Sequence, residues 1–377
     1  MAAAQSWIAL LGRRDHPVDG VEDYCTFLAS ALARQGVTLQ LSRVEWDRLG
    51  WLAALFRLSR DAREWGGCWV LLQYTALGWS RRGFALGALF AAHILKRRGA
   101  RLAIVFHEPE RQHAGARLLD RIRGAVQDWV IRGLFARSEK SIFADALESV
   151  SWLPRDRAKA AFIPIGANIP EPPKASVAEP ASPPAGPETT VAVYCLSTLP
   201  NRERELSDIS RAVEFAAASA PATPLRVVFF GRGTDEASDE IRSAFGSGKV
   251  NVEVRGILDA AAVSAALSRS DVLLAVRGPL FPRRGSVIAG IACGLPIVAY
   301  ANGRSTFPLS EAGVEFARWH EPQELAQALE RVVRDPALRN ALRDKSCRAF
   351  EQYMSWDAIA QSFRRTFSSD PPDAGAE

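Results

Sequence analysis

Apolar runs of strand length alternate with segments of helical periodicity along almost the whole chain. In the first half the candidate strands are Ile8–Leu11, Thr38–Leu41, Trp69–Gln73, Leu102–Phe106, Ser141–Phe143 and Ala161–Ile165. In the second half they are Val191–Cys195, Val227–Phe230, Val250–Val254, Val272–Val276 and Pro296–Tyr300. After Trp319 the pattern is helical almost to Phe367. Such alternation predicts parallel strands joined by crossover helices, and therefore an α/β protein with two Rossmann-like, doubly wound units.

A segment without hydrophobic periodicity separates the two series of strands. Residues 170–189 are rich in Pro, Ala and Ser, a composition that cannot form a core and is typical of a linker. We therefore predict an N-terminal domain over residues 1–169 and a C-terminal domain over residues 190–377 that includes the closing helices. Ligands of such sheets bind at the carboxyl ends of the strands, so we expect the two domains to face a cleft that holds the site.

The charge is distributed unevenly between the two halves. The net charge is +5, but residues 1–168 hold 24 Lys/Arg against 16 Asp/Glu, whereas residues 169–377 hold 23 against 26. Eight of the ten tryptophans also lie in the first half. This pattern favours an anionic partner such as a membrane surface, although an arginine-rich composition alone explains it equally well. Nucleic acid is not expected as a partner, because the arginines are scattered over helices and no recognised nucleic-acid motif is present.

Two segments of the first half are candidates for a membrane-surface helix. Residues 46–57 predict one helix with Trp46, Leu49, Leu52, Leu55 and Phe56 along one stripe, and residues 117–137 add a second amphipathic segment with Trp129. Apolar and aromatic residues flanked by arginines suit a helix in the headgroup layer of a bilayer. The alternative is that both stripes are core faces that pack on the sheet.

Cysteine and acidic patterns give no sign of a metal. Five cysteines lie far apart with no zinc-ligand spacing, and there is no DxD pair that could hold a divalent cation on a nucleotide. The first residues lack the basic and apolar regions of a secretion signal, and no apolar run reaches the length of a membrane span. We expect no metal, no resident cofactor and a cytoplasmic location, with peripheral attachment at the inner face of the membrane as an option.

Two glycine-containing loops are candidates for binding an anion. Gly231, Arg232 and Gly233 directly follow the strand LRVVFF, where glycines let a backbone approach a phosphate closely, although an unliganded tight turn fits equally well. The second loop places arginines and free backbone N–H groups at the start of a helix, a combination that suits a diphosphate without a metal. Its residues are Arg283, Arg284, Gly285 and Ser286.

Two loops of the first half are candidates for polar chemistry. His107 follows the strand LAIVF and is suitable for hydrogen bonding or general acid–base catalysis, although a lone histidine is more often structural. A similar loop after the first strand contains Asp15, His16 and Asp19 and is closed by Gly20.

Eight segments carry a resemblance to a known family. In the first half they are DGVEDYCTFLASALARQGVTL, FHEP and IPIGANI. In the second half they are LRVVFFGRG, VEVRGIL, LSRSDVLLAV, AGIACGLPIVAY and MSWDAIAQSFRRTF. Their order and spacing over about residues 6–367 resemble the GT-B glycosyltransferases of family 4.

The resemblance implies the GT-B architecture and transfer of a sugar from a nucleoside-diphosphate sugar to a glycan or lipid-linked acceptor. It further implies retention of configuration, no metal, and a role in bacterial polysaccharide or glycolipid biosynthesis. In this interpretation His107 and Arg284 are catalytic, Gly231–Gly233 and Arg283–Ser286 bind the donor, and the Gly20 loop shapes the acceptor side.

One departure from the family pattern leaves other functions open. The positions of the two glutamates that normally face the nucleotide sugar are occupied by Phe281 and Ala289. The usual basic residue after the first strand of the second half is also not evident, and Arg202 or Arg204 could take its place. The alternatives are an inactive glycosyltransferase-like binding protein and a GT-B nucleotide-sugar epimerase.

Overall fold

The chain forms two compact units in a computed structural model. The described residues are 5–15, 19–111, 118–170, 188–219, 224–246, 248, 250–301, 303 and 306–368. The first unit contains the chain up to Ile165 and again from Trp356 onward, and the second contains Gly166–Ser355. All but the two ends of the predicted linker lie outside the described residues.

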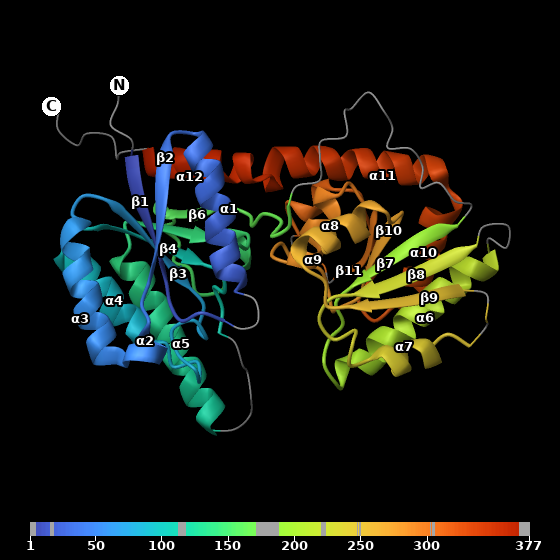
Figure 1. Cartoon of the computed structure of the whole chain (residues 1–377), viewed down its shortest axis with the longest axis horizontal. Helices are drawn as coiled ribbons and strands as arrows, with labels where there is room; N and C mark the ends of the chain where they lie inside the picture. The colour runs from blue at the N-terminus through green and yellow to red at the C-terminus, as the bar shows by residue number, and fades with distance from the viewer. Residues whose placement is uncertain are drawn as a thin grey trace. The chain divides into compact units, whose positions relative to one another are not determined.

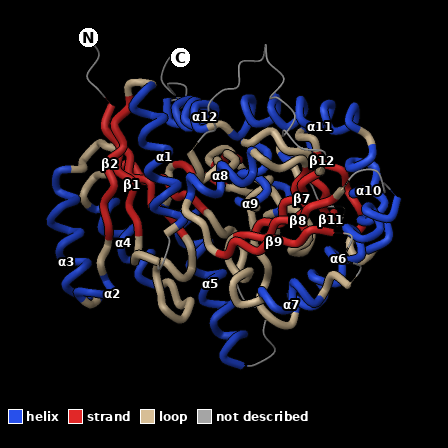
Figure 2. Tube along the Cα trace, turned by 45° about the vertical axis from the view of Figure 1, so that its right-hand side comes forward, coloured by secondary structure: helices blue, strands red, loops and turns tan. Residues whose placement is uncertain are grey.

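The first unit is built on a parallel sheet of six strands, drawn in red in Figure 2. The strand order is β2-β1-β3-β4-β5-β6, and neighbouring strands pair in parallel throughout. The strands are β1 (Gln5–Leu11), β2 (Val37–Arg43), β3 (Trp69–Tyr74), β4 (Arg101–Phe106), β5 (Lys140–Phe143) and β6 (Ala160–Phe162).

Helices cover both faces of this sheet, which is why its central strands β3 and β4 are buried at all but one position. Ile8 and Leu10 of β1 enter one core, whereas Trp7, Ala9 and Leu11 enter the other. Figure 1 shows α3 and α4 on the far side of the sheet from α1. The face of Ile8 is covered by α2 (Trp46–Leu49), α3 (Trp51–Asp61), α4 (Leu86–Arg97) and α5 (Leu118–Arg137). The face of Trp7 is covered by α1 (Gly20–Arg34) and α12 (Trp356–Ser368).

The second unit repeats this plan with the strand order β12-β11-β10-β7-β8-β9, again all parallel. The strands are β7 (Thr189–Tyr194), β8 (Leu225–Phe230), β9 (Val250–Gly256), β10 (Val272–Ala275), β11 (Ile297–Ala301) and β12 (Val314–Arg318). The helices are α6 (Asn201–Ser219), α7 (Ser238–Ser243), α8 (Ala260–Ser268), α9 (Gly285–Ala292), α10 (Pro322–Arg334) and α11 (Pro336–Ala349). Short 3-10 turns lie at Ala62–Glu64, Leu147–Ser149 and Leu309–Glu311, and a π-helical turn at Phe350–Met354 follows α11.

Helix α9 is the element of this unit that matters most for the site. Helices α6 and α10 share a core with Val272 and Leu274 of β10. Helix α9 packs instead on Leu273, which points to the opposite face, and the helix comes so close that a Cβ on Gly290 would lie 2.5 Å from the Leu273 side chain. The start of α9 is therefore fixed beside the carboxyl end of β10.

The two parallel six-stranded sheets confirm the predicted fold class, and three details differ from the sequence expectations. Strand β12 was not predicted, because the charged residues Glu315 and Arg318 interrupt its short apolar run and Ala317 is its only fully buried residue. Helix α12, which we predicted as part of the C-terminal domain, belongs to the first unit. The helix predicted over residues 46–57 is divided into α2 and α3 at Gly50, whose positive φ of 77° interrupts the helical backbone.

Candidate functional site

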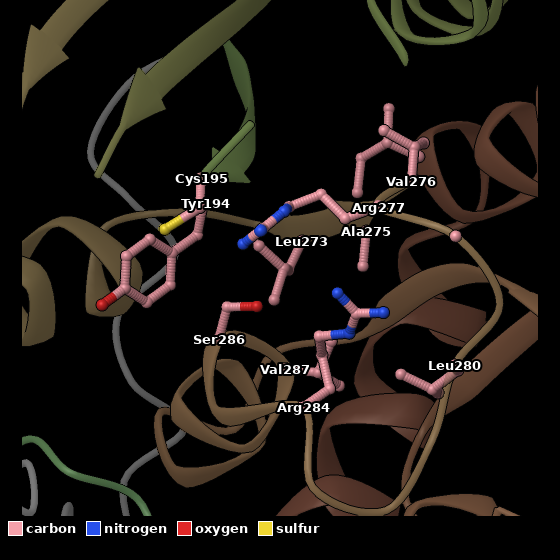
Figure 3. A pocket seen from close by; sticks show the side chains of 12 residues that line it. Tyr194, Cys195, Leu273, Ala275, Val276, Arg277, Leu280, Arg284, Ser286 and Val287 are labelled. Atoms are coloured by element: carbon pink, nitrogen blue, oxygen red, sulfur yellow. The ribbon is translucent and has the colours of Figure 1, made fainter. Parts of the chain in front are cut away.

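A small pocket lies where the carboxyl ends of β7 and β10 meet the start of α9 (Figure 3). This is the edge of a parallel sheet at which ligands of such folds bind. The pocket is lined by Tyr194, Cys195, Leu273, Leu274, Ala275, Val276, Arg277, Gly278, Leu280, Arg284, Ser286 and Val287. Two of these lining residues are arginines and none is acidic, so the pocket favours a negatively charged group.

Arg277 and Arg284 supply the positive charge. Arg277 follows β10 by two residues, and its buried Nε has no hydrogen-bond partner among the described residues. The Arg284 guanidinium lies 4.5 Å from the ring centroid of Phe281, and its Nη2 donates weakly to the Pro279 carbonyl at 3.4 Å. Burial, followed by the charge of Arg277, lowers the pKa of Arg284 to about 10, so the side chain stays protonated at neutral pH.

The start of α9 adds neutral donors to the same pocket. Arg284 is the N-cap residue of this helix, and its carbonyl accepts from the N–H groups of Val287 and Ile288. The N–H groups of Gly285 and Ser286 have no carbonyl partner in the described part of the chain, as expected for a first helical turn. Figure 3 shows Arg277, Arg284 and Ser286 around the same pocket, with the Arg277 guanidinium extending toward Cys195 and Tyr194. Two cations, a hydroxyl and a helix N-terminus are groups whose charge and hydrogen-bond donors suit an anion.

The glycine turn after β8 lies next to this pocket but contributes no lining residue. Gly231 has a φ of 92°, and a Cβ there would lie 2.7 Å from Cys195 Sγ and 2.8 Å from the Tyr194 ring. Gly233 has a φ of 83°, and a Cβ there would lie 2.7 Å from the Leu196 carbonyl oxygen. Both glycines are thus explained by packing against the residues after β7, and the intervening Arg232 is exposed.

Cys195 lines the pocket and also contacts the glycine turn. Its backbone is in the left-handed region with a φ of 68°, and its N–H donates to the Phe230 carbonyl at 2.8 Å. Burial raises the pKa of its thiol, so the group is neutral at physiological pH. Cys195 therefore contributes shape rather than charge or a thiolate nucleophile.

The structure brings together only some of the donor-site residues predicted from the sequence. Arg284 and Ser286 line the pocket, and Gly285 precedes Ser286 in the first turn of α9. Arg283 and Arg232 are absent from the lining. Arg277 was missed, although its position just after a predicted strand, at the edge where ligands bind, was a usable signal.

The two candidate basic residues of α6 have other contacts. Arg202 is buried and forms paired hydrogen bonds of 2.9 Å to both carboxylate oxygens of Glu240. The Arg204 guanidinium lies over the Trp319 ring at 4.6 Å from its centroid. Glu205, which follows Arg204 in the chain, is buried and accepts from the Ser197 N–H at 2.8 Å.

In the first unit, His107 lies directly after β4, as predicted. Its Nε2 is 2.8 Å from Oε1 of the buried Gln73, and its ring meets the Tyr24 ring edge-on at 4.9 Å between centroids. These two contacts hold the imidazole in one orientation, as a binding or acid–base residue requires.

Gly20 is the first residue of α1, where Asp19 caps the helix by accepting from the N–H groups of Val21 and Glu22. Arg43 lies 3.1 Å from the Asp19 carboxylate and fixes the cap in place. His16, the other candidate in this loop, lies outside the described residues.

The described residues contain no cluster of three or more His, Cys, Asp or Glu side chains suited to a metal ion. None of their helices is both long enough and apolar enough to cross a bilayer.

No protein-family model matches the chain, and no curated protein matches its sequence. Solved structures do match it. HepE of Anabaena, in complex with UDP and glucose, is 12% identical with a TM-score of 0.64, covering 97% of this chain and 100% of its own. Sucrose-phosphate synthase of Thermosynechococcus elongatus is 15% identical with a TM-score of 0.63 and the same coverage. A putative UDP-N-acetylglucosamine 2-epimerase of Listeria monocytogenes is 11% identical with a TM-score of 0.59 and covers all of both chains. The chain has the GT-B fold.

Proposed function

We propose that this protein is a glycosyltransferase that moves a sugar from a nucleoside-diphosphate sugar to a glycan or lipid-linked acceptor. The observation that carries the proposal is the pocket in which Arg277, Arg284 and the start of α9 converge without an acidic residue. Its donors match a diphosphate in charge and in hydrogen-bonding capacity. The proposal is supported by HepE, a protein of the same fold whose structures contain UDP and UDP-glucose.

The proposed reaction breaks the bond between the anomeric carbon and the diphosphate oxygen, and forms a bond to an acceptor hydroxyl whose proton passes to the released diphosphate. Negative charge develops on the departing diphosphate. Arg277, Arg284 and the N–H groups of Gly285 and Ser286 would stabilise that charge as preorganised donors. Because the charge is met by protein cations, we propose a metal-independent reaction.

The remaining parts of the proposal come from the family resemblance. They are retention of configuration, a role in bacterial polysaccharide or glycolipid biosynthesis, and contacts of His107 and the Gly20 loop to the sugar and the acceptor. The hydrogen bond from His107 to Gln73 supports an oriented imidazole of this kind.

The test measures nucleotide affinity by calorimetry for UDP, GDP, ADP and dTDP, with and without a chelator. We expect one of them to bind, and we expect Arg277→Gln and Arg284→Gln each to weaken that binding by about ten- to a hundredfold, the value of a charge-assisted hydrogen bond. Arg269→Gln, an exposed arginine at the end of α8, is the matched control. Unchanged affinity in both pocket variants, or binding only with added Mg²⁺, would contradict the anion site as described.

A second candidate function is a nucleotide-sugar epimerase, favoured by the similarity to the Listeria protein over the full length of both chains. Incubation of the protein with a bound nucleotide sugar and no acceptor distinguishes the two, because an epimerase converts the sugar under these conditions and a transferase does not. A protein that binds the nucleotide and converts nothing with any acceptor would instead be the inactive binding protein.

A further inference from the structure

The outer surface of α3, α4 and α5 exposes several large apolar side chains that face away from the sheet. Leu52 is 89% exposed, Phe56 78% and Trp129 61%. The full set, which we call the outer helix face, is Leu52, Phe56, Leu86, Phe90, Leu118, Leu119, Ile122 and Trp129. Side chains of this size are normally buried, and a cluster of them on the surface marks an interaction site.

The spacing of these residues shows that each helix has two apolar sides. The outward residues recur four or seven positions apart, as Leu52 and Phe56, as Leu86 and Phe90, and as Ile122 and Trp129. The inward sides of the same helices are buried in the core through Ala54 and Leu58, Ala88 and Ala92, and Val130 and Leu134. The outward apolar rows therefore do not contribute to the core of the first unit.

Two glycines pack the three helices into one layer. A Cβ on Gly87 of α4 would lie 1.8 Å from the Trp51 ring of α3, and a Cβ on Gly133 of α5 would lie 2.9 Å from Leu89 of α4. Figure 1 shows the three helices on the same side of the first sheet. The apolar rows consequently lie on neighbouring helices of a single surface.

Unpaired cations accompany this surface. Arg82, Lys96, Arg97, Arg121 and Arg132 are exposed, and none of them forms an ion pair with another described residue. Helix α4 contains no acidic residue. The two acidic residues of α5 are already paired, Asp120 with Arg123 at 3.3 Å and Asp128 with Arg111 at 3.7 Å. The first 168 residues carry the excess positive charge of the chain.

We propose that the outer helix face binds the surface of an anionic lipid bilayer. Leu52, Phe56, Phe90 and Trp129 would enter the boundary between headgroups and acyl chains, and the long arginine and lysine side chains would reach the lipid phosphates. The cations come from separate helices and form no fixed cluster, which suits a fluid anionic surface better than one acidic peptide. Since no described helix can span a bilayer, the attachment would be peripheral and reversible.

This proposal concerns the first unit alone and does not depend on the nucleotide pocket. The first test is co-sedimentation with vesicles of phosphatidylcholine, with and without phosphatidylglycerol. We expect binding only to the anionic vesicles, and we expect it to weaken as salt is added. Equal recovery in the supernatant with both kinds of vesicle at low salt overturns the proposal.

Charge variants identify the surface that binds. The triple variant Arg97→Glu, Arg121→Glu, Arg132→Glu should bind anionic vesicles at least about tenfold more weakly, because three attractive contacts become repulsive. The control triple variant Arg242→Glu, Arg269→Glu, Arg348→Glu changes the net charge equally on exposed residues of the second unit. If the two triple variants lose binding equally, the attraction depends on net charge alone and the assigned surface is wrong.

Apolar variants test insertion separately. Vesicles with brominated acyl chains should quench tryptophan fluorescence in the wild-type protein, and much less in Trp129→Phe. Phe56→Ser with Phe90→Ser should weaken vesicle binding while leaving nucleotide affinity unchanged, since both side chains are exposed in the first unit. If these serine substitutions instead alter the oligomeric state in gel filtration and leave vesicle binding intact, the face is a protein interface and the proposal fails.

Discussion

The surroundings of Arg277 and Arg284 are unfavourable for their charged side chains, which reduces the stability of the folded protein. Burial and mutual repulsion lower the pKa of Arg284, which means that its charged form is disfavoured by its surroundings. The buried Nε of Arg277 has no hydrogen-bond partner among the described residues. Groups kept in such an environment are typical of binding sites, because an arriving anion removes the repulsion and supplies the missing contacts.

This arrangement predicts opposite effects of one substitution on stability and on binding. Arg284→Gln removes a buried charge and its repulsion with Arg277, so the melting temperature without nucleotide should stay the same or rise by about 2–4 °C. The same variant should lose most of the stabilisation that nucleotide gives the wild-type protein. Scanning calorimetry with and without the nucleotide measures both quantities. A large fall in the melting temperature without nucleotide would mean that Arg284 is structural.

At the scale of elements, the close contact between α3 and α4 depends on one missing side chain. The Trp51 ring lies where a Cβ on residue 87 would be, and Trp51 also stacks on Trp46 of α2 at 5.0 Å between centroids. Because Gly87 has no side chain, the Trp51 ring of α3 packs against both α4 and α2.

Gly87→Ala tests this contact. In an exposed helix the change would stabilise by about 1 kcal/mol, but here the new methyl group meets the Trp51 ring. We expect a net loss of about 1–3 kcal/mol in the free energy of unfolding, measured with urea. The control is His93→Ala, at an exposed position of the same helix, which should change stability little. A stabilised Gly87→Ala would show that Trp51 moves aside at no cost.

The sequence predicted the elements that have a local apolar pattern and missed features defined by tertiary contacts. Eleven strands are visible as apolar runs, whereas β12 is not, because the charged residues Glu315 and Arg318 interrupt it. The Arg-Gly-Ser start of α9 is a local pattern and was predicted. Arg277 was missed because only its position after a predicted strand marks it in the sequence, and the residues that form the pocket with it come from β7 and α9 after folding. Residues 46–57 match a helical period, but hydrophobic periodicity does not show the positive φ of Gly50 that divides the segment into two helices.

At the scale of the whole molecule, the sequence could not assign the last helix to a unit, because an amphipathic stripe fits any apolar face. In the structure the aromatic residues of α12 complete the first core. The Phe367 ring lies 5.0 Å from Trp7 and 4.6 Å from Trp69 between centroids, and Trp356 lies 5.3 Å from Tyr24. Arg34 and Asp357 add an ion pair of 2.6 Å at the surface.

A chain that ends after Ser355 should therefore lose stability in the first unit and keep the second. Removal of α12 exposes several buried aromatic side chains, each of which contributes about 3–5 kcal/mol when truncated in a core. Hydrogen exchange should show lost protection in β1 and β3 and retained protection in β7 and β10. A chain that ends after Ser368 keeps α12 and is the control. Equal loss of protection in both units would contradict their division at Ser355.

The return of the chain to the first unit also determines when each unit can be completed during synthesis. A ribosome makes the strands of the first sheet early, but it makes the helix that covers Trp7 and Trp69 only after the whole second unit. The second unit, which is continuous from Gly166 to Ser355, has all its residues before that helix appears. The usual N-terminal-first order of domain folding is thus reversed here for the final step. Until α12 has been made, the part of the first sheet that this helix covers stays exposed as an apolar surface that a chaperone could recognise.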